Sequence, residues 1–352
     1  MSNTISELQA AASLPRWYPP FALIVSVLLT LTAFTFLSTS GGGVNLVAVG
    51  VLGFAVYMVV TYLLSRSVEG RRKATDRMVT GWVTAAFGLA VIPLVSLAWT
   101  VVEKGINRMD AEFFTSSMRN VVGEGGGALH AIVGTLELTT IATLISVPLG
   151  IMTAIYLVEY GRGRLAKAVT FFVDVMTGIP SIVAGLFAFS LFLILLGPAS
   201  AINGLAGAVS LAVLMTPVVV RATEEMLKIV PNELREAAYA LGVPKWLTIV
   251  KVVLPTALAG IATGVIIAIA RVIGETAPLL LAAGFTTSMN YNPLSEKMMT
   301  LPVFVYTSYA IQGTNPQAYV DRAWAGALTL MIIVMVLNLA ARIISKLFSP
   351  KG

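Results

Sequence analysis

The stretch from Arg221 to Pro255 reads RATEEMLKIVPNELREAAYALGVPKWLTIVKVVLP and lies between two apolar segments. Its apolar residues recur at the three- and four-residue spacing of an amphipathic helix. Pro231 suits the start of a helix, whereas Gly242 followed by Pro244 is a stop signal. The pattern therefore predicts two or three short helices that lie outside the membrane.

Basic side chains give this stretch the charge pattern of a loop on the cytoplasmic side of a membrane. They are Arg221, Lys228, Arg235, Lys245 and Lys251. A compact helical projection on that side indicates a docking surface for a cytoplasmic partner. We call residues 221–255 the knob.

The spacing inside the knob resembles the EAA loop of bacterial ABC-importer permeases. That loop has the pattern EAA, three residues, Gly, nine residues, Ile, one residue and Leu-Pro. The matching residues are Glu236, Ala237, Ala238, Gly242, Val252, Leu254 and Pro255, with Val252 in place of the usual Ile. The resemblance implies that these residues couple the chain to an ATPase, since small Ala side chains allow close approach and Gly permits a sharp turn. The alternative is an ordinary amphipathic cytoplasmic loop.

The whole chain has the composition of a membrane protein. Of its 352 residues, 57% are hydrophobic and 11% are charged, which excludes a soluble domain. The sequence has no Cys and a single His, His130, so it offers no disulfide, thiolate metal site or His-based metal cluster. The basic residues lie between apolar segments, so the net charge of +6 reflects membrane topology rather than nucleic-acid binding.

About eight apolar segments have the character of membrane spans. They are residues 21–37, 44–64, 78–102, 129–158, 168–196, 204–220, 256–283 and 323–344. Most of the 23 Lys and Arg residues lie before span one, between spans two and three, between spans four and five, in the knob and after span eight. Because such residues concentrate on the cytoplasmic side, we expect both termini there.

This topology predicts the following division of the chain. Residues 1–20 form a cytoplasmic N-terminal segment, 21–64 an extra transmembrane hairpin, 65–128 a cytoplasmic loop with the third span and an external loop, 129–345 the main transmembrane domain with the knob, and 346–352 a cytoplasmic tail. One external segment, residues 294–312, is apolar but too short to cross the membrane. It either lies at the outer interface or re-enters the membrane part way.

Arg271 is the one basic residue placed within a span, near its middle, and Glu275 follows one helical turn later. An Arg at such a position costs about 2.5–3.5 kcal/mol on insertion scales, so it should face a cavity or a partner. Two interpretations remain open. Arg271 either forms a pair with Glu275 that only holds helix packing, or lines a path for an anion, because a guanidinium binds oxyanions through a planar fork and keeps its proton.

Three further segments narrow the resemblance to the permeases of phosphate importers. They are RVIGETAPLL at 271–280, GIPSIV at 178–183 and SVPLGIMTAIYLVEY at 146–160. Together with the EAA loop, they favour the A-type permease of such importers over its C-type partner. The resemblance covers roughly residues 80–345 and implies no role for the hairpin at 21–64.

The resemblance implies an all-α polytopic bundle with the core of a type I ABC importer permease, in a bacterial cytoplasmic membrane. The chain would form half of the pore of an ATP-driven phosphate importer, with Arg271 and Glu275 on the substrate pathway. Implied partners are a C-type permease subunit, a cytoplasmic ATPase dimer, an external phosphate-binding protein and membrane lipids. The sequence has no GxxxxGK[ST] motif, so ATP and magnesium belong to the ATPase. We expect this chain to be no enzyme and to hold no metal or cofactor.

Two other functions remain as alternatives. A permease of the same fold could carry another oxyanion, such as molybdate or sulfate, although the GETAPL-like segment favours phosphate. An integral-membrane enzyme that modifies lipids would show acid-rich metal or diphosphate motifs on cytoplasmic loops. The acids of the knob instead alternate with basic residues on an amphipathic pattern, which disfavours the enzyme.

Overall fold

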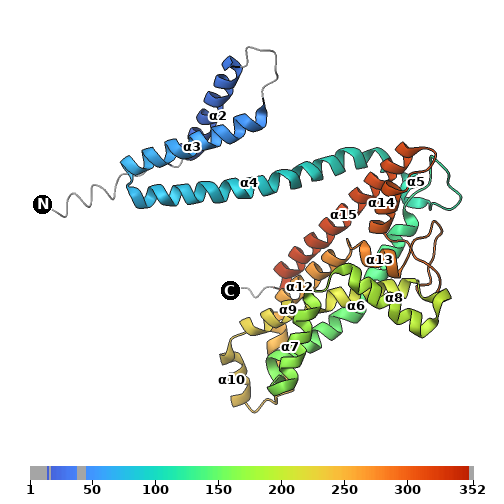
Figure 1. Cartoon of the computed structure of the whole chain (residues 1–352). Coiled ribbons are helices and arrows are strands. Elements are labelled where there is room, and N and C mark those ends of the chain that lie inside the picture. Colours follow the sequence, from blue (N-terminus) through green and yellow to red (C-terminus); the bar gives the residue numbers. More distant parts are fainter. Residues whose placement is uncertain (1–13, 16, 38–44, 349–352) are drawn as a thin grey trace. The chain divides into compact units, whose positions relative to one another are not determined.

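The computed structural model describes residues 14, 15, 17–37 and 45–348, and within these ranges the chain is helical and has no strand (Figure 1). It divides into two compact units, Met1–Ala98 and Trp99–Gly352. The expected cytoplasmic segment 1–20 lies largely outside the described residues, and so does most of the tail at 346–352.

The first unit begins with two paired helices, α2 (Tyr18–Leu37) and α3 (Leu46–Val68), which overlap the predicted spans at 21–37 and 44–64. The Asn45 side chain caps α3 by accepting hydrogen bonds of 3.1 Å from the backbone N–H groups of Val47 and Ala48. A Cβ atom added to Gly53 would lie 2.9 Å from Thr30 Oγ1. The two helices are therefore as close as a glycine permits.

The third helix, α4 (Arg71–Gly105), differs from the prediction, which placed a loop over residues 65–77 and a span over 78–102. Only Glu69 and Gly70 separate α3 from α4. Gly70 supplies the positive φ of +87° that so tight a turn requires. Arg and Lys have high helix propensity, which explains why the helix begins in the basic segment rather than at the apolar one.

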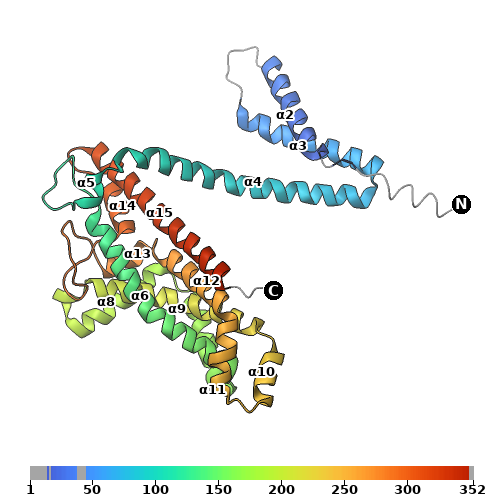
Figure 2. The ribbon, with the colours of Figure 1, turned by 180° about the vertical axis from the view of Figure 1, so that it is seen from behind.

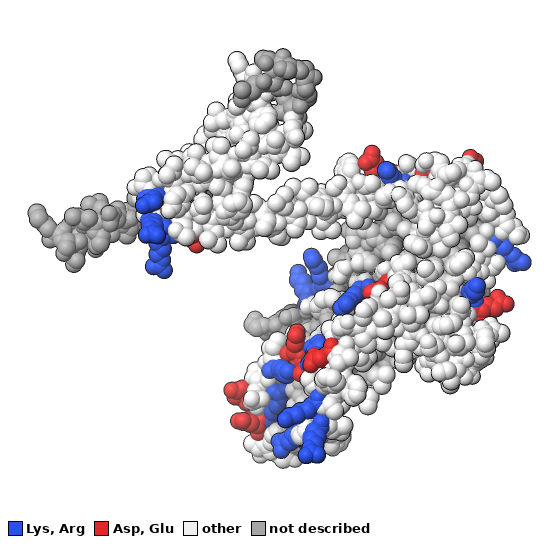
Figure 3. Space-filling view, viewed as in Figure 1, with Lys and Arg blue, Asp and Glu red and all other residues white. Residues whose placement is uncertain are grey.

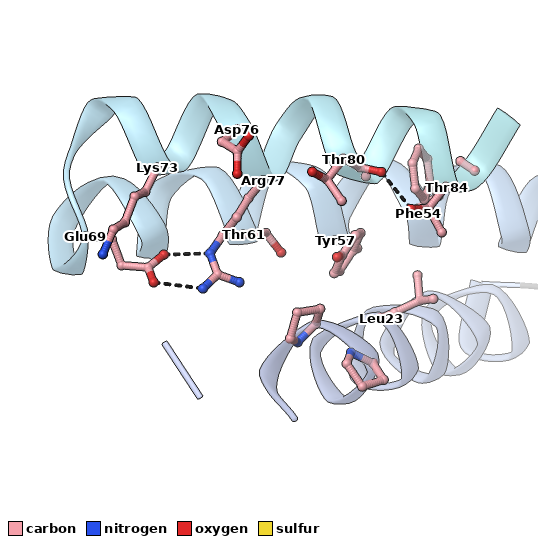
Figure 4. A pocket seen from close by; sticks show the side chains of 14 residues that line it. Leu23, Phe54, Tyr57, Thr61, Glu69, Lys73, Asp76, Arg77, Thr80 and Thr84 are labelled. Carbon is pink, nitrogen blue, oxygen red and sulfur yellow. Dashed lines mark hydrogen bonds and ion pairs between the residues drawn. The ribbon is translucent and has the colours of Figure 1, made fainter. Parts of the chain in front are cut away.

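A bidentate ion pair holds this turn to the start of α4 (Figure 4). Arg77 Nε and Nη2 donate to the two carboxylate oxygens of Glu69 at 2.6 and 2.7 Å. The Ser65 hydroxyl and the Leu14 backbone N–H donate to the same carboxylate at 2.6 and 2.7 Å. The Glu69 side chain is 1% exposed. Mainly through the hydrogen bond from Arg77, the pKa of Glu69 is lowered from 4.5 to about 2.

Four long helices form the centre of the second unit (Figures 1 and 2). They are α6 (Leu129–Ile155), α9 (Gly204–Ile229), α12 (Leu254–Val272) and α15 (Pro316–Phe348). Helix α9 packs against both α6 and α12. A Cβ atom on Gly150 of α6 would lie 2.6 Å from Val219 Cγ1, and one on Gly264 of α12 would lie 2.6 Å from the Ala222 Cβ. The core of the bundle therefore depends on small residues at the helix crossings.

Shorter elements connect these helices. They are η1 (Ile106–Arg108), α5 (Ala111–Thr115), η2 (Tyr156–Tyr160), α7 (Gly163–Thr177), α8 (Ser181–Leu196), η3 (Pro198–Ser200), α10 (Asn232–Ala240), α11 (Lys245–Thr248), η4 (Ile249–Val253), α13 (Ala277–Ala282) and α14 (Leu301–Ala310). Both η2 and η4 are π-helical turns.

The predicted span at 168–196 is not one straight helix. Helices α7 and α8 meet at an angle of 110° across Gly178–Pro180. Pro180 has ψ of 139°, outside the helical range, and it lacks the N–H that a continuous helix would use. At about 1.5 Å per residue, neither half alone is as long as the hydrocarbon layer is thick.

The external segment at 294–312, which was predicted to be too short to cross the membrane, contains α14, a helix of 10 residues. Its first turn is buried, with Leu301 and Phe304 inside the core, and the Leu301 N–H donates to Thr135 Oγ1 of α6 at 2.7 Å. A helix of this length cannot cross a membrane. The choice between an interfacial and a re-entrant position remains a prediction.

Seven helices of the described residues are long and apolar enough to cross a membrane, and the bent pair α7–α8 makes eight if it forms one span. The prediction of an all-helical membrane protein with about eight spans is thereby confirmed.

The ion pair in the first unit predicts an acid-sensitive stability. Because the pKa of Glu69 is lowered on folding, the stabilisation is complete above about pH 4.5 and is lost as the pH falls towards 2. Glu69→Gln should remove on the order of 2–3 kcal/mol at neutral pH. Thermal unfolding of the two proteins between pH 7 and 2.5 should therefore differ near neutrality and converge in acid.

Asp76→Asn is the matched control, since Asp76 lies near the same helix end and makes no ion pair among the described residues. It should unfold like the unmodified chain at neutral pH. A Glu69→Gln protein with unchanged stability at pH 7 would contradict the stabilising role of the pair.

Candidate functional site

The knob forms one end of the second unit, where α9 and α12 meet it (Figures 1 and 2). Its first residues, 221–229, continue α9 instead of forming a separate helix. Helices α10 and α11 and the turn η4 then lead into α12, so the expected two or three short helices are present. Leu254 and Pro255 form the first turn of α12.

A buried ion pair attaches α10 to the end of α6. Arg235 donates through Nε and Nη2 to Glu159 Oε1 at 3.0 and 2.9 Å. The two side chains are 12% and 5% exposed. Arg235 also donates to the backbone oxygens of Val230 and Leu227 at 2.6 and 2.9 Å. The guanidinium therefore links three segments: η2, the C-terminal end of α9 and α10.

A second basic residue of the knob contacts the same turn. Lys245 Nζ donates to the backbone oxygen of Glu159 and lies 4.8 Å from the centroid of the Tyr160 ring, within the range of a cation–π contact. Both attachments end on η2, where the π-helical turn of α6 is formed. The knob is therefore held to three helices: α6 through η2, and α9 and α12 through the chain itself.

Gly242 ends α10 in a Schellman arrangement. Its φ is +74°, its N–H donates to the Tyr239 oxygen at 2.9 Å, and the Val243 N–H donates to the Ala238 oxygen at 3.1 Å. A Cβ atom at Gly242 would meet nothing within 4 Å. The requirement for glycine is therefore conformational and not a matter of space.

The three residues of the EAA motif do not face the same way. Ala238 is buried at 8% exposure, whereas Glu236 and Ala237 are exposed on α10. Leu241 and Trp246 are 84% and 61% exposed beside them. Lys, Arg, Asp and Glu side chains gather at this end of the unit (Figure 3). Exposed apolar residues among charges are typical of a surface that contacts another protein.

A further set of charges lies where α7 meets α9. Arg221 forms ion pairs with Asp174 of α7 and, at 2.6 Å, with Glu224. Lys228 contacts Glu224 at 2.6 Å. Glu224 is buried at 8% exposure. Because α9 continues into the knob, this network connects the bent pair α7–α8 to the segment that leads into α10.

Arg271 and Glu275 lie at the far end of α12 from the knob, about 25 Å away by helix rise. The structure corrects two expectations here. Arg271 lies in the last turn of α12 and not mid-helix, and α12 ends at Val272, so Glu275 is not on the same helix. Among the ion pairs of the described residues, none joins Arg271 to Glu275. Arg271 is exposed in this single chain and Glu275 is half-buried.

Helix α8, which begins inside the GIPSIV segment, packs against α13, which begins inside the 271–280 segment. A Cβ atom on Gly185, in α8, would lie 2.6 Å from the Cα and 2.9 Å from the oxygen of Pro278, in α13. Residues far apart in the sequence thus form one contact close to the break between α12 and α13.

Glu159, Arg235 and Lys245 were not predicted as a group. Arg235 and Lys245 were interpreted only as markers of the cytoplasmic side, and Glu159 was assigned to a short loop. Glu159 and Arg235 are separated by 76 positions, so no local spacing relates them. The one signal in the sequence is the position of Glu159 beside a basic loop. That position does not indicate that Arg235 is its partner.

The comparison with known families identifies the class of the protein. The family described as "Binding-protein-dependent transport system inner membrane component" matches residues 146–351, which include the whole knob and the 271–280 segment. The chain belongs to this family of transport permeases. It is a multi-pass membrane protein, in agreement with its seven or eight candidate spans.

Individual relatives are more specific. The chain is 48% identical over 283 residues to "Phosphate transport system permease protein PstA 1" of Mycobacterium tuberculosis strain CDC 1551, covering 79% of this chain and 91% of that protein. It is 45% identical to the PstA of Mycobacterium leprae, over 80% and 91% of the two chains. A bacterial alginate ABC transporter shares its fold with a TM-score of 0.55 at 17% identity, over 79% and 98%.

The ion pair between η2 and α10 predicts a non-additive response to mutation. Glu159→Gln leaves the half-buried Arg235 guanidinium with only its backbone acceptors, and losing a hydrogen bond to a charged group costs about 1.5–3 kcal/mol. The helix α10 should detach locally, so its backbone amides should exchange with solvent faster. Glu159→Gln combined with Arg235→Gln should cost less than the sum of the two single changes.

Hydrogen–deuterium exchange of the 232–240 peptide measures this effect directly. Arg162→Gln is the control, since Arg162 is an exposed neighbour of η2 that makes no ion pair in the described part of the chain. If the effects of the two single changes simply add in the double variant, the pair does not attach α10.

Proposed function

We propose that this chain forms half of the translocation pore of an ATP-driven importer of inorganic phosphate. The observation that carries the proposal is its 48% identity, over nine-tenths of the relative's length, to the M. tuberculosis protein named PstA 1. The sequence segments at 271–280 and 178–183 support the same substrate, and the helices that begin inside them, α13 and α8, pack together in the fold.

The partners follow from the same proposal. A C-type permease subunit completes the pore, a cytoplasmic ATPase dimer binds the knobs, and an external phosphate-binding protein delivers the ion. ATP and magnesium are held by the ATPase, because this sequence has no phosphate-binding loop of the Walker type. The chain lies in the bacterial cytoplasmic membrane with the knob and both termini on the cytoplasmic side, as its basic segments favour.

The knob transmits the movement of the ATPase to the pore. Glu236 and Ala237 face outward for contact, and Ala238 and the Gly242 turn fix the orientation of α10. Leu254 and Pro255 continue this surface into α12. Because Arg235 and Lys245 attach the knob to η2, a displacement of α10 moves the ends of α6, α9 and α12 together.

Arg271 and Glu275 contribute to the substrate path. Phosphate carries one to two negative charges at neutral pH, and an apolar pore excludes such an ion. A guanidinium without an internal partner lowers that barrier, and its planar fork matches an oxyanion. Glu275 is close in sequence and tempers the attraction, so that the ion binds only weakly and is released. The exposure of Arg271 and the absence of a pair with Glu275 favour this role over a purely structural one.

Two alternatives are weaker. A permease for molybdate or sulfate would share this fold, but the relatives reported above are named for phosphate transport. A lipid-modifying enzyme is disfavoured because those relatives are named as transport permeases, and no cluster of acids or His that could hold a metal occurs in the described ranges.

Gly242→Val tests the coupling role. Val in a left-handed conformation costs about 1–2 kcal/mol or more, equivalent to a factor of about 5–30 in the population of the Schellman turn. Transport-coupled ATP hydrolysis in the reconstituted complex should fall by a similar factor, with insertion in the membrane unchanged. Gly242→Asn should retain more activity, because Asn tolerates this conformation.

Gly197→Val is the matched control, since Gly197 has φ of +77° and equally open surroundings but lies after α8. Equal losses in Gly197→Val and Gly242→Val, or full coupling in Gly242→Val, would exclude the knob as the specific docking site.

Arg271→Gln tests the substrate path. The variant should insert, assemble and bind the ATPase, but phosphate uptake into vesicles should fall roughly tenfold or more, as expected when a hydrogen bond to a charged group is lost. Arg271→Lys should be intermediate because it keeps the charge and loses the fork. Glu275→Gln should alter release or selectivity rather than abolish uptake.

Arg342→Gln is the control for this series, because Arg342 is an exposed Arg on α15 with no ion pair among the described residues. Complex assembly must be measured in parallel. Full phosphate uptake by an assembled Arg271→Gln complex would show that Arg271 does not serve the pathway.

A further inference from the structure

The first unit contains a cavity of about 840 Å³ among α2, α3 and α4 (Figure 4). Its lining residues all belong to this unit. The cavity lies outside the segment matched by the transport family, residues 146–351. Nothing in the coupling or substrate path described above uses it.

The two ends of the cavity have different chemistry. Glu69, Lys73, Asp76 and Arg77 form a charged end at the α3–α4 turn, whereas Leu23, Phe54 and Ala85 line an apolar end further along the helices. Figure 4 shows the same order along α4, with Lys73 at one end and Thr84 at the other. A ligand that fits both ends has a charged group and a hydrocarbon chain.

The charged end favours an anion. Arg77 and Glu69 neutralise each other, whereas Lys73 makes no ion pair among the described residues. A neighbouring surface hollow shares Lys73 with the cavity and is lined by Arg71, Arg72, Lys73, Thr75, Asp76 and Val79. Asp76 is the one acid that lines this hollow, and its charge offsets one of the three basic residues. The charged groups that line the cavity itself balance, with Lys73 and Arg77 against Glu69 and Asp76. Arg71 and Arg72 of the adjoining hollow make the two hollows together net positive.

Thr61 gives an independent indication of a ligand. Its side chain lines the cavity and is 3% exposed, yet its hydroxyl has no hydrogen-bond partner among the residues that the structure describes. Other Thr residues of this unit, such as Thr30 and Thr84, donate to a backbone oxygen of the preceding turn. A buried hydroxyl normally finds a partner, and a ligand acceptor that reached Thr61 would supply one.

We propose that this cavity binds one anionic phospholipid. Its phosphate lies against Lys73 and Arg72, and an ester oxygen accepts a hydrogen bond from the Thr61 hydroxyl. One acyl chain occupies the apolar end between Leu23 and Phe54. Basic pockets between transmembrane helices at the cytoplasmic surface are suited to acidic headgroups. The exposed apolar faces of α2 and α3 give an acyl chain direct access from the bilayer.

Two other occupants would share part of this chemistry. Free inorganic phosphate would use the charged end alone and leave the apolar end empty. The chain's own residues 1–13 contain a single acid, Glu7, and so offer little complement to the basic groups. The phospholipid is the occupant that uses both ends and the Thr61 hydroxyl.

The test uses the full-length complex in nanodiscs that contain equal amounts of phosphatidylglycerol and phosphatidylcholine. Native mass spectrometry counts the lipids retained after detergent extraction. A phosphatidylglycerol with a diazirine in its acyl chain identifies the contact, and its crosslinks should map to the peptides with Leu23 and Phe54. We expect phosphatidylglycerol to be retained in preference to phosphatidylcholine.

Three variants separate the parts of the site. Arg72→Gln with Lys73→Gln should lower phosphatidylglycerol retention roughly tenfold or more, since each basic group near an acidic lipid contributes about a factor of five. Thr84→Trp fills the apolar end and should abolish the acyl crosslinks. Thr61→Val keeps the volume and removes only the hydroxyl, so it folds with least disturbance and should lower retention to a smaller extent.

The double change Arg162→Gln with Arg164→Gln is the control, because it removes two exposed basic residues from the second unit. Equal losses in this control would indicate general attraction of acidic lipid and overturn the proposal. Equal retention of phosphatidylglycerol and phosphatidylcholine would also overturn the proposal. Competition by inorganic phosphate without acyl crosslinks would favour the free ion. Increased crosslinking after deletion of residues 2–13 would assign the cavity to that segment.

Discussion

The close approach of α9 to its neighbours is the constraint on which the second unit depends. Lipid tails are as apolar as Leu, so helices in a membrane associate through close packing and hydrogen bonds rather than through burial from water. Here glycines provide that approach: a Cβ atom at Gly150, Gly207, Gly260 or Gly264 would overlap a side chain of the facing helix. With these contacts on several sides, α9 becomes the axis around which α6, α12 and the short helices α8 and α13 are arranged. The knob and the Arg271 end of α12 both take their positions from this axis.

The same packing attaches the knob to the helix core in a way that its own sequence does not reveal. An amphipathic loop between two spans could move independently of them. In this chain the loop begins as a direct continuation of α9, and the buried Arg235–Glu159 pair ties it to a third helix. Breaking such a pair is costly because one charge would remain buried. The contact surface around Glu236 and Leu241 is therefore connected to the helix core through rigid attachments, while its outer face remains exposed.

Much of this architecture was predictable from local patterns, and the failures have a common cause. Span positions, the short helices of the knob and the turn at Gly242 follow from periodicity, hydropathy and glycine chemistry, which act over a few residues. The prediction failed at helix ends that hydropathy does not mark: α12 stops at Val272 inside an apolar segment, and α4 begins at Arg71 within a basic segment. The angle of 110° at which α7 and α8 meet was not predicted. The Glu159–Arg235 contact spans 76 positions, and no pattern in one sequence encodes it.

The second unit has two interrupted helices, α7–α8 and α12–α13, and α8 contacts α13. This contact lies close to Arg271 in the sequence and helps to explain its surroundings. Gly185 of α8 touches Pro278 of α13, a few residues beyond the break that follows α12. Irregular backbone at membrane depth is tolerated only where protein packs against it or where it lines a water-filled path. Packing accounts for the Gly185 contact on one side of the break. On the other side, Arg271 remains exposed and without an ion pair in the described chain, and a charge in that position requires water, a second subunit or an anion. The pore that we propose between two permease subunits would provide all three.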